Sequence, residues 1–391
     1  MYGVTAGLAA AGHRVTVLAA NTPKHRQPAD ALAHLGPQVR LVAVDVDTDL
    51  SPVRALLNLL FSGLPYNVKR FINGDLLSAL VELLNEGPVD VIQFEGTFVA
   101  WYNEWLGYEE LIPANAVTVL RAHNIEYTIW EMLAGRARNP LKKWYLEKLA
   151  ARLRQFEHEY LKYFDAVAAI TDDDARRLRA LGCPEPVVCI PAGVDLTKFR
   201  PDPAIRPQPR TLFMLGSLNW LPNLEGVEWL LREIWPILHA EMPDVELHLA
   251  GSGAPEALLK PRTDNVFVHG FVDSAPAFMK RYELMLVPLL SGGGMRVKII
   301  EGLALGKAIL STSLGAEGIA VRDGHDIVLR DGPAAWLGAL RAWHRGEVPV
   351  AALGAEAART AADLYDNRRV TQQFEALYGR LRRPVPAAPA P

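Results

Sequence analysis

The sequence of residues 288–302 is Pro-Leu-Leu-Ser-Gly-Gly-Gly-Met-Arg-Val-Lys-Ile-Ile-Glu-Gly. A buried strand ends in a run of three glycines, and a helix follows. Glycine lets the backbone approach a ligand closely, and a helix N-terminus offers free N–H groups and a positive dipole. The stretch therefore predicts a diphosphate-binding turn between a strand and a helix.

The charged residues of this helix suggest a division of roles. Arg296 and Lys298 lie in the first turn, and we expect both to bring positive charge to a diphosphate. Arg296 falls within the apolar arc of the helix, so we expect it to avoid burial by reaching out from the helix start. Glu301 is at the right depth to accept hydrogen bonds from ribose hydroxyls. The alternative is an ordinary glycine-rich turn with a surface pair of Lys298 and Glu301.

Three other predicted strands also end in glycine. Gly216 follows the first, the pair Gly251 and Gly253 follows the second, and Gly270 follows the third. Any one of these glycines is explained by an ordinary turn. Because the carboxyl ends of parallel strands meet at one edge of a sheet, the four glycine-containing ends together predict a shared crevice.

Short strands and helices alternate along the whole chain, which predicts an α/β fold with parallel sheets covered on both faces. The Pro-rich stretch 200–209 divides two such series. We therefore expect two doubly wound, Rossmann-like domains, at residues 1–200 and 201–364, with ligands in the cleft between them. Residues 365–391 are expected to form a helix that crosses back to the first domain and a disordered tail. The predicted strands are 14–19, 39–45, 89–94, 117–121, 166–170, 187–190, 211–215, 245–250, 266–268, 284–287 and 308–311.

Composition excludes several classes of protein. The 391 residues carry a formal net charge of -3, so no global charge favours nucleic acid. The two cysteines cannot form a disulfide framework, and no Cys/His cluster suggests zinc. No apolar run approaches the length of a membrane helix, and the first residues do not resemble a signal peptide. We therefore expect a cytoplasmic protein.

Several motifs together resemble retaining glycosyltransferase family 4, which has the GT-B fold of two facing Rossmann-like domains. The branch it most resembles makes bacterial exopolysaccharides and cell-surface glycans. The resemblance covers nearly the whole chain. The motifs that carry it lie at residues 190–201, 216–223, 251–253, 270–272 and 292–307.

The resemblance implies a nucleotide-sugar donor, a glycan or lipid-linked acceptor, no cofactor and no metal. It also implies catalysis with retention of the anomeric configuration. His123 sits where the family often places a histidine beside the transferring sugar, although a structural histidine is the alternative. Arg296 and Lys298 would stabilise the leaving diphosphate. Donor-binding roles fall on Glu301, Gly292, Gly293, Gly294, Met295, Gly216, Gly270 and Val272.

The sequence departs from the family pattern in three places. Gly293 stands where the motif's first glutamate would fall, and the segment 216–222 lacks the usual cations. We expect Arg296 and Lys298 to replace that charge. The first strand and its glycine-rich donor loop should precede the helix at residues 2–11, so we expect the first domain to lack its central strand.

Other interpretations remain open at this stage. A nucleotide-sugar epimerase on the same fold, or a non-catalytic nucleotide-sugar-binding subunit, would fit many of the same residues. The acidic run 172–174 follows Thr171 and opens a helix, which favours a helix-capping role over metal binding. The basic and aromatic segment 141–162 suggests either a peripheral membrane contact or a solvated outer helix with snorkelling lysines.

Overall fold

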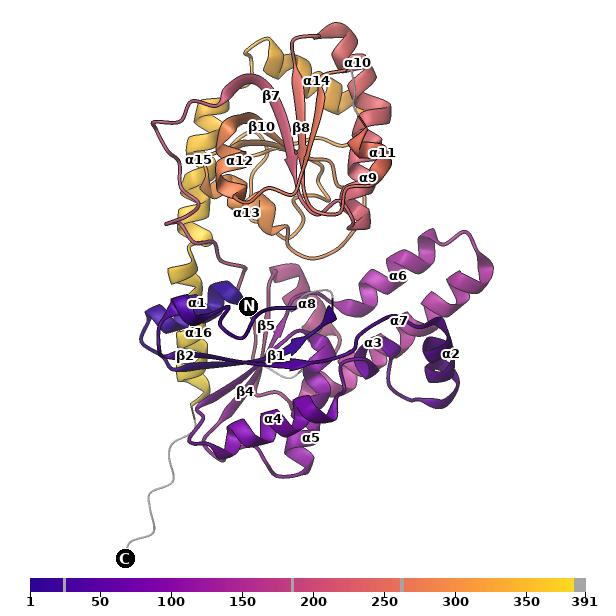
Figure 1. Ribbon diagram of the computed structural model, residues 1–391, viewed down its shortest axis with the longest axis vertical. Helices are drawn as coiled ribbons and strands as arrows, with labels where there is room; N and C mark the ends of the chain where they lie inside the picture. Colours follow the sequence, from indigo (N-terminus) through magenta and orange to yellow (C-terminus); the bar gives the residue numbers. More distant parts are fainter. Residues whose placement is uncertain (24–25, 184–185, 261–263, 383–391) are drawn as a thin grey trace, which may run out of the picture. The chain divides into compact units, whose positions relative to one another are not determined.

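A computed structural model describes residues 1–23, 26–183, 186–260 and 264–382. The chain divides into two compact units, and each is described here by itself (Figure 1). Unit 1 contains Met1–Pro191 and the segment from Val370 onward, and unit 2 contains Ala192–Arg369. The units divide between Pro191 and Ala192, ahead of the Pro-rich stretch from which the sequence placed the boundary at residue 200.

Unit 2 contains one parallel sheet of six strands in the order β12-β11-β10-β7-β8-β9. Renumbered along the chain, this is the strand order 3-2-1-4-5-6 of doubly wound dinucleotide-binding domains. The strands are β7 (Gln208–Leu215), β8 (Glu246–Ala250), β9 (Val266–Gly270), β10 (Tyr282–Val287), β11 (Ala308–Ser311) and β12 (Val328–Leu329).

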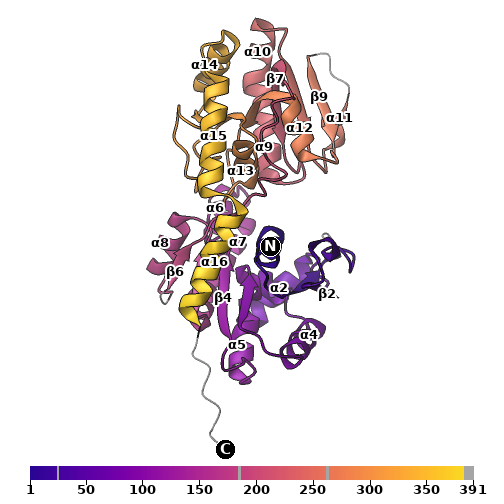
Figure 2. The ribbon, with the colours of Figure 1, turned by 90° about the vertical axis from the view of Figure 1, so that its left-hand side faces the viewer.

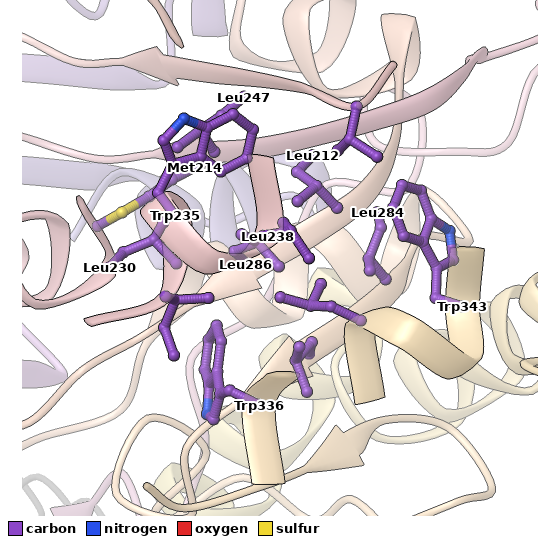
Figure 3. Packing of buried hydrophobic residues seen from close by; sticks show 14 of the residues in the cluster. Leu212, Met214, Leu230, Trp235, Leu238, Leu247, Leu284, Leu286, Trp336 and Trp343 are labelled. Atoms are coloured by element: carbon purple, nitrogen blue, oxygen red, sulfur yellow. The ribbon is translucent and has the colours of Figure 1, made fainter. Parts of the chain in front are cut away.

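Helices pack an apolar core against each face of this sheet. One core is rich in tryptophan and leucine, with Trp235 and Trp336 almost fully buried (Figure 3). The other core includes Ile299, Ile300 and Leu303 of α13. The helices are α9 (Leu221–Trp229), α10 (Trp235–Glu241), α11 (Glu256–Leu259), α12 (Ala275–Arg281), α13 (Val297–Ala304), α14 (Pro333–His344) and α15 (Val350–Leu364), followed by α16 (Asn367–Leu381).

The strands of unit 1 are also parallel, but they form two separate sheets. One sheet pairs β1 with β2, and the other has the order β3-β4-β5-β6. In the part of the chain that the structure describes, no ladder joins β1 to β3, and the division falls where a central strand was expected. The strands are β1 (Val15–Asn21), β2 (Val39–Asp45), β3 (Val91–Glu95), β4 (Val117–Ala122), β5 (Ala166–Ala169) and β6 (Val187–Cys189).

Two clusters of apolar side chains cover the four-stranded sheet. The larger one lies under α5 and α7, and the smaller one joins Val4 of α1 to Phe374 and Leu377 of α16. Figure 2 shows α16 running along unit 1 next to this sheet. The helices are α1 (Tyr2–Ala10), α2 (Pro52–Phe61), α3 (Tyr66–Lys69), α4 (Gly74–Asn85), α5 (Ala100–Tyr108), α6 (Glu126–Arg136), α7 (Pro140–Tyr160) and α8 (Asp172–Ala180).

Candidate functional site

The carboxyl ends of β7, β8, β9 and β10 lead into the glycine-containing loops that the sequence singled out. The loop after β7 packs directly on the loop after β8. A Cβ atom added to Gly251 would lie 1.8 Å from the carbonyl oxygen of Gly216, and one added to Gly253 would lie 2.7 Å from Asn219 Cβ. Close backbone packing therefore explains Gly251 and Gly253 without any ligand, because no larger residue fits there.

Gly216 instead faces a cation. A Cβ atom added to Gly216 would lie 2.7 Å from Asn223 Nδ2 and 2.8 Å from Lys298 Nζ. Lys298 Nζ donates a hydrogen bond of 2.6 Å to Asn223 Oδ1, and Asn223 Nδ2 donates to the carbonyl oxygen of Ser217. The ammonium group of α13 thus lies at the end of β7, beside the loop that contains no cation of its own.

The environment of Lys298 weakens its hold on a proton. Burial is the main cause that lowers its pKa to about 7, the nearby charge of Arg296 lowers it further, and Glu301 acts in the opposite direction. An opposite charge brought close to the ammonium group would raise the pKa again. Binding of an anion would therefore favour the protonated, positively charged form of Lys298.

Glu301 lies three residues further along α13 and is similarly shielded. Burial raises the pKa of its carboxyl group to about 7, and Lys298 partly counteracts this. Among the residues that the structure describes, the carboxylate of Glu301 has no hydrogen-bond or ion-pair partner, and Lys298 Nζ bonds to Asn223 instead. The alternative interpretation, a surface pair of Lys298 and Glu301, is wrong because both groups are shielded and the two do not pair.

Arg296 occupies a different position from the one that the sequence suggested. Arg296 is only 4% exposed, so the expectation that it avoids burial is wrong. Its Nη1 donates 2.6 Å to the carbonyl oxygen of Gly293, and its Nη2 donates 3.1 Å to that of Gly292. The buried Nε has no hydrogen-bond partner among the described residues. The guanidinium group therefore stabilises the glycine loop, because it hydrogen-bonds to two backbone carbonyl oxygens of that loop.

The glycine loop itself needs its glycines. Gly292 has a φ of 103° and Gly294 a φ of 76°, both in the left-handed region that favours glycine. A Cβ atom on Gly292 would lie 3.2 Å from Pro222 Cγ and 3.4 Å from Trp220 Cη2. The loop after β10 therefore packs against the start of α9, and the residues after β7 and β10 form one continuous surface.

Two further contacts in this region were not foreseen from the sequence. Ser291 Oγ donates 2.5 Å to Glu225 Oε2 of α9, and Asn223 holds Lys298. Both Asn223 and Glu225 follow a proline near the start of a helix, a pattern that is also typical of plain helix initiation. No signal in the sequence distinguished them from such a helix start.

The end of β9 offers an open backbone. Gly270 has a φ of 65°, its carbonyl oxygen accepts 2.7 Å from the Gly251 N–H, and nothing lies within 4 Å of an added Cβ atom. Phe271, the next residue, is 73% exposed, whereas Val272 and Met295 pack against the core of unit 2. Backbone groups and an exposed aromatic ring at this edge suit contact with a planar base.

In unit 1, His123 follows β4 and lies next to Glu95 at the end of β3. His123 Nε2 is 2.8 Å from Glu95 Oε2, an ion-pair distance. Gln93 Nε2 donates 2.6 Å to the other oxygen, Oε1, and Tyr378 of α16 in turn donates to Gln93. Glu95 is the main site residue here that the sequence did not indicate.

The carboxylate of Glu95 is ionised despite its burial. Burial alone would raise its pKa, but His123, the amino group of Met1 and Arg121 together lower it to about 2. The guanidinium of Arg121 lies behind it, over the ring of Phe374. A charged carboxylate at this distance fixes the orientation of the imidazole ring.

A second buried carboxylate holds the segment after His123. Glu157 of α7 accepts 2.9 Å from the N–H of Glu126 and 3.1 Å from that of Tyr127, at the start of α6. Burial raises the pKa of Glu157 to about 8, against the effect of those two N–H groups. Glu157 therefore holds the start of α6 in place, and with it the preceding loop that contains His123.

The structure also bears on metals and membranes. Among the described residues, no group of three or more His, Cys, Asp or Glu side chains is placed to hold a metal ion. Thr171 Oγ1 accepts from the N–H of Asp174, so the acidic run opens α8 as a capped helix start. Within the same described residues, no helix combines the length and apolar character that crossing a membrane requires.

Comparison with protein families identifies the chain. Residues 1–198 match the family model described as Glycosyltransferase Family 4, and residues 209–345 match the one described as Glycosyl transferases group 1. The chain belongs to Glycosyltransferase Family 4. The first model alone covers half of the sequence, and the second contains all four of the glycine-containing loops described above.

Two curated proteins illustrate the relatives of this family member. An uncharacterized 44.6 kDa protein in the cps region of Klebsiella pneumoniae is 24% identical over 221 residues, which cover 54% of this chain and 55% of that protein. A phosphatidyl-myo-inositol mannosyltransferase of Mycolicibacterium smegmatis is 29% identical over 160 residues, which cover 39% of this chain and 41% of that protein. The matched stretches thus span about half or less of these relatives.

Solved structures of glycosyltransferases resemble this family member over almost its whole length. Sucrose-phosphate synthase from Thermosynechococcus elongatus has a TM-score of 0.68 at 16% identity, covering 97% of this chain and 91% of that one. Alr3699/HepE of Anabaena, solved in complex with UDP, has a TM-score of 0.67 at 13% identity, covering 97% and 95%. At these identities the likeness shows the fold, and the expected GT-B class with two Rossmann-like units is confirmed.

Proposed function

We propose that the chain is a glycosyltransferase that moves a sugar from a nucleoside-diphosphate donor to a glycan or lipid-linked acceptor. Configuration at the anomeric carbon is retained, and no metal ion takes part. The observation that carries the proposal is the ammonium group of Lys298, which lies between Asn223 and Gly216 at the carboxyl end of β7. Family membership and the UDP present in the HepE structure support a nucleotide donor.

Each part of the donor has a proposed contact in unit 2. Lys298 and the N–H groups at the start of α13 bind the diphosphate, with Gly292, Gly293 and Gly294 close to the sugar and the β-phosphate. The carboxylate of Glu301 accepts hydrogen bonds from the ribose. The backbone of 270–272 contacts the base, and Met295 packs beneath the loop.

Negative charge develops mainly on the leaving diphosphate during the reaction. The bond between the anomeric carbon and the diphosphate oxygen breaks, and that oxygen takes the electron pair. The acceptor hydroxyl attacks from the same face, its oxygen bonds to the anomeric carbon, and its proton passes to the departing phosphate. Lys298 stabilises the developing charge directly, and Arg296 acts as a positioning residue that fixes the loop carbonyls of Gly292 and Gly293.

His123 is proposed to bind the transferring sugar from unit 1. Its partner Glu95 remains ionised and holds the ring, so the imidazole can donate a hydrogen bond to a sugar hydroxyl. This is the role that a positioning carboxylate commonly gives to a histidine. The two neighbouring groups, Gln93 and Tyr378, would then keep that carboxylate in place.

The experiment that tests the proposal measures release of nucleoside diphosphate from a panel of nucleotide sugars, with and without glycan and lipid-linked acceptors. We expect acceptor-dependent release and a product that retains the anomeric configuration by NMR. Lys298→Met should lower turnover by at least about a hundredfold, the scale of losing one charge-stabilising donor. Addition of EDTA should leave the rate unchanged.

Other outcomes would identify the alternatives. Release of nucleoside diphosphate without an acceptor would favour an epimerase-like or hydrolytic reaction. Tight donor binding with no turnover on any acceptor would favour a non-catalytic binding subunit, which the glycine at position 293 would suit. Lys260→Met, at an exposed site after α11 in unit 2, is the matched control and should behave as the unaltered chain.

A further inference from the structure

A groove runs along α7 in unit 1, beside α6 and the end of α8. It encloses about 750 Å³, and all of its lining residues belong to this unit. Helices α6 and α7 lie side by side as a hairpin (Figure 1). The groove follows α7 from Lys143 to His158, a length of about 22 Å at a rise of about 1.5 Å per residue. It is therefore long enough to receive another helix.

Small residues line the middle of the groove. Ala150 and Ala151 belong to α7, and Ala134 and Gly135 belong to α6. A Cβ atom added to Gly135 would have nothing within 4 Å, so the backbone of α6 is open at this point. The distance between two packed helices depends on the side chains at their contact. Alanine and glycine here therefore allow a second helix to approach closely.

The charged residues of the groove are placed symmetrically about its middle. Glu147 lies three residues before Ala150, and Arg154 lies three residues after Ala151. All four residues line the groove, so they share one side of α7. A twofold axis between the two alanines would therefore place Glu147 of one helix level with Arg154 of an antiparallel copy.

The two ends of the groove follow the same symmetry. Lys143 lies seven residues before Ala150, and His158 lies seven residues after Ala151. His158 Nδ1 is 2.6 Å from the carbonyl oxygen of Leu181, and because a carbonyl oxygen only accepts, Nδ1 carries the proton. In the neutral ring Nε2 is then an acceptor, which suits the ammonium group of Lys143 from an antiparallel copy.

Within one copy, these charges make only loose contacts with one another. Lys143 Nζ is 4.0 Å from Glu147 Oε1, at the limit of an ion pair, and the Arg154 guanidinium lies 5.6 Å from the centre of the Tyr127 ring. An exposed ion pair of this kind contributes little to stability, so it is easily exchanged for a better one. Glu131 of α6 also lines the groove, so among the described lining residues two carboxylates balance two cations.

We infer that the groove binds a second copy of the chain, with the two α7 helices packed antiparallel across a twofold axis between Ala150 and Ala151. In such a symmetric contact each Glu147 faces Arg154 of the other copy, so the same two residues form two ion pairs. Lys143 of each copy donates to His158 Nε2 of the other. The inference goes beyond the proposed transferase function and does not depend on it.

Other occupants match the groove less well. A uniformly anionic or cationic partner would meet as many like charges as unlike ones, because the two carboxylates and two cations balance. A second copy meets only unlike charges at the level of Glu147 and Arg154, because the twofold axis exchanges these two positions. Charge complementarity therefore favours self-association.

The test is sedimentation equilibrium of the full chain at concentrations up to about 100 μM, where a dimer of micromolar affinity is nearly complete. We expect a dimer. Glu147→Arg and Arg154→Glu should each raise the dimer dissociation constant by at least about a hundredfold, because each change brings two pairs of like charges together. Glu82→Arg, at an exposed position of α4, is the matched control and should dimerise like the unaltered chain.

Two further measurements separate this pairing from a general loss of stability. Glu147→Arg combined with Arg154→Glu reverses both charges, so unlike charges face one another again and the dimer should return. An equimolar mixture of the two single variants should form a heterodimer, although neither variant dimerises alone, because the mixed pair restores both ion pairs. Formation of that heterodimer would also show that both single variants are folded.

Several outcomes would overturn the inference. These are a monomer at the highest concentration, a dimer that either single variant leaves intact, or a mixture of the single variants that stays monomeric. Ala151→Trp tests the position of the axis, because a bulky ring at the middle of the groove should dissociate the dimer, and an unchanged dimer would contradict it. Donor binding should be normal in all these variants, so failure here is distinguishable from failure of the proposed transferase function.

Discussion

Lys298 and Glu301 are two opposite charges with nearly the same titration range. The pKa of Lys298 falls to about 7 and that of Glu301 rises to about 7, in both cases mainly because of burial. A diphosphate is bound by the charged ammonium of Lys298, and ribose hydroxyls donate most strongly to the ionised carboxylate of Glu301. Donor binding therefore requires two groups that titrate in opposite senses over the same interval.

This arrangement predicts a bell-shaped dependence of donor affinity on pH, with a maximum near neutrality. Below about pH 7 Glu301 gains a proton and loses the negative charge that strengthens its hydrogen bonds from the ribose. Above about pH 7 Lys298 loses the positive charge that holds the phosphate. Titration calorimetry with a nucleotide sugar at several pH values measures it. Glu301→Gln should remove the acidic limb, and Lys298→Met the alkaline limb.

The loss of donor-binding free energy in a Glu301 variant depends on the hydrogen bonds that the carboxylate makes to the ribose. Glu301→Ala should weaken donor binding by about 1.5–3 kcal/mol, the usual value for a bond to a charged group. Unchanged affinity in a folded variant would disprove the ribose role. Val297→Ala, on the exposed side of the same helix, is the matched control and should leave the pH profile intact.

The sequence indicated residue types at the site better than their contacts. The run from Gly292 to Glu301 located Lys298 and Glu301 at the end of a strand, since glycines and charges at that spacing are readable from sequence. It could not place Arg296, which turns back to the loop carbonyls and is buried. Glu95 was also missed, because its partner His123 is distant in sequence and only the pairing of β3 with β4 brings them together.

At the scale of elements, α9 approaches β10 through a glycine. A Cβ atom on Gly226 would lie 2.4 Å from the carbonyl oxygen of Pro288, the residue after β10. Gly338 in α14 is also a helical glycine, but it is exposed and nothing lies within 4 Å of its added Cβ atom. The two positions share backbone conformation and differ in their surroundings.

The same substitution should therefore have opposite effects at these two positions. Gly338→Ala should stabilise the protein by about 0.5–1 kcal/mol, because alanine restricts the unfolded chain and favours helix. Gly226→Ala has the same favourable effect on the unfolded chain and the helix, but the added Cβ atom forces α9 away from β10. We expect it to destabilise the protein by about 1–3 kcal/mol overall. Calorimetric melting of the two variants measures both shifts, and shifts of equal sign would contradict the account of α9 packing.

Strands were easier to predict than helices. The strands 39–45 and 308–311 have the bounds expected, because buried parallel strands are short apolar runs bounded by turn residues. The helical residues between β7 and β8 are instead interrupted by a π-helical segment, Leu230–Ile234. Pro236 lacks the N–H that would bond back to Arg232, so the helix changes its hydrogen-bond register there.

At the scale of the whole molecule, the two units use the same alternation of strand and helix with different results. In unit 2 the strands complete one sheet, and the glycine-containing loops lie along its carboxyl edge. In unit 1 the strands form two sheets, and an alternating pattern alone does not determine whether neighbouring strands pair. A gap at the central strand of the first domain was expected from the family resemblance, whereas the strand order within each sheet required the structure.

That division has a consequence for hydrogen exchange. A two-stranded sheet is marginal on its own, and the strands β1 and β2 contain a single buried residue, Val39, whereas every residue of β4 is buried. The backbone amides of Val15–Asn21 and Val39–Asp45 should therefore open separately from the rest of unit 1 and exchange with solvent deuterium at least about tenfold faster than those of Val117–Ala122. Mass spectrometry of peptic fragments measures this difference. Equal protection of the two sheets would mean that they unfold as one cooperative body.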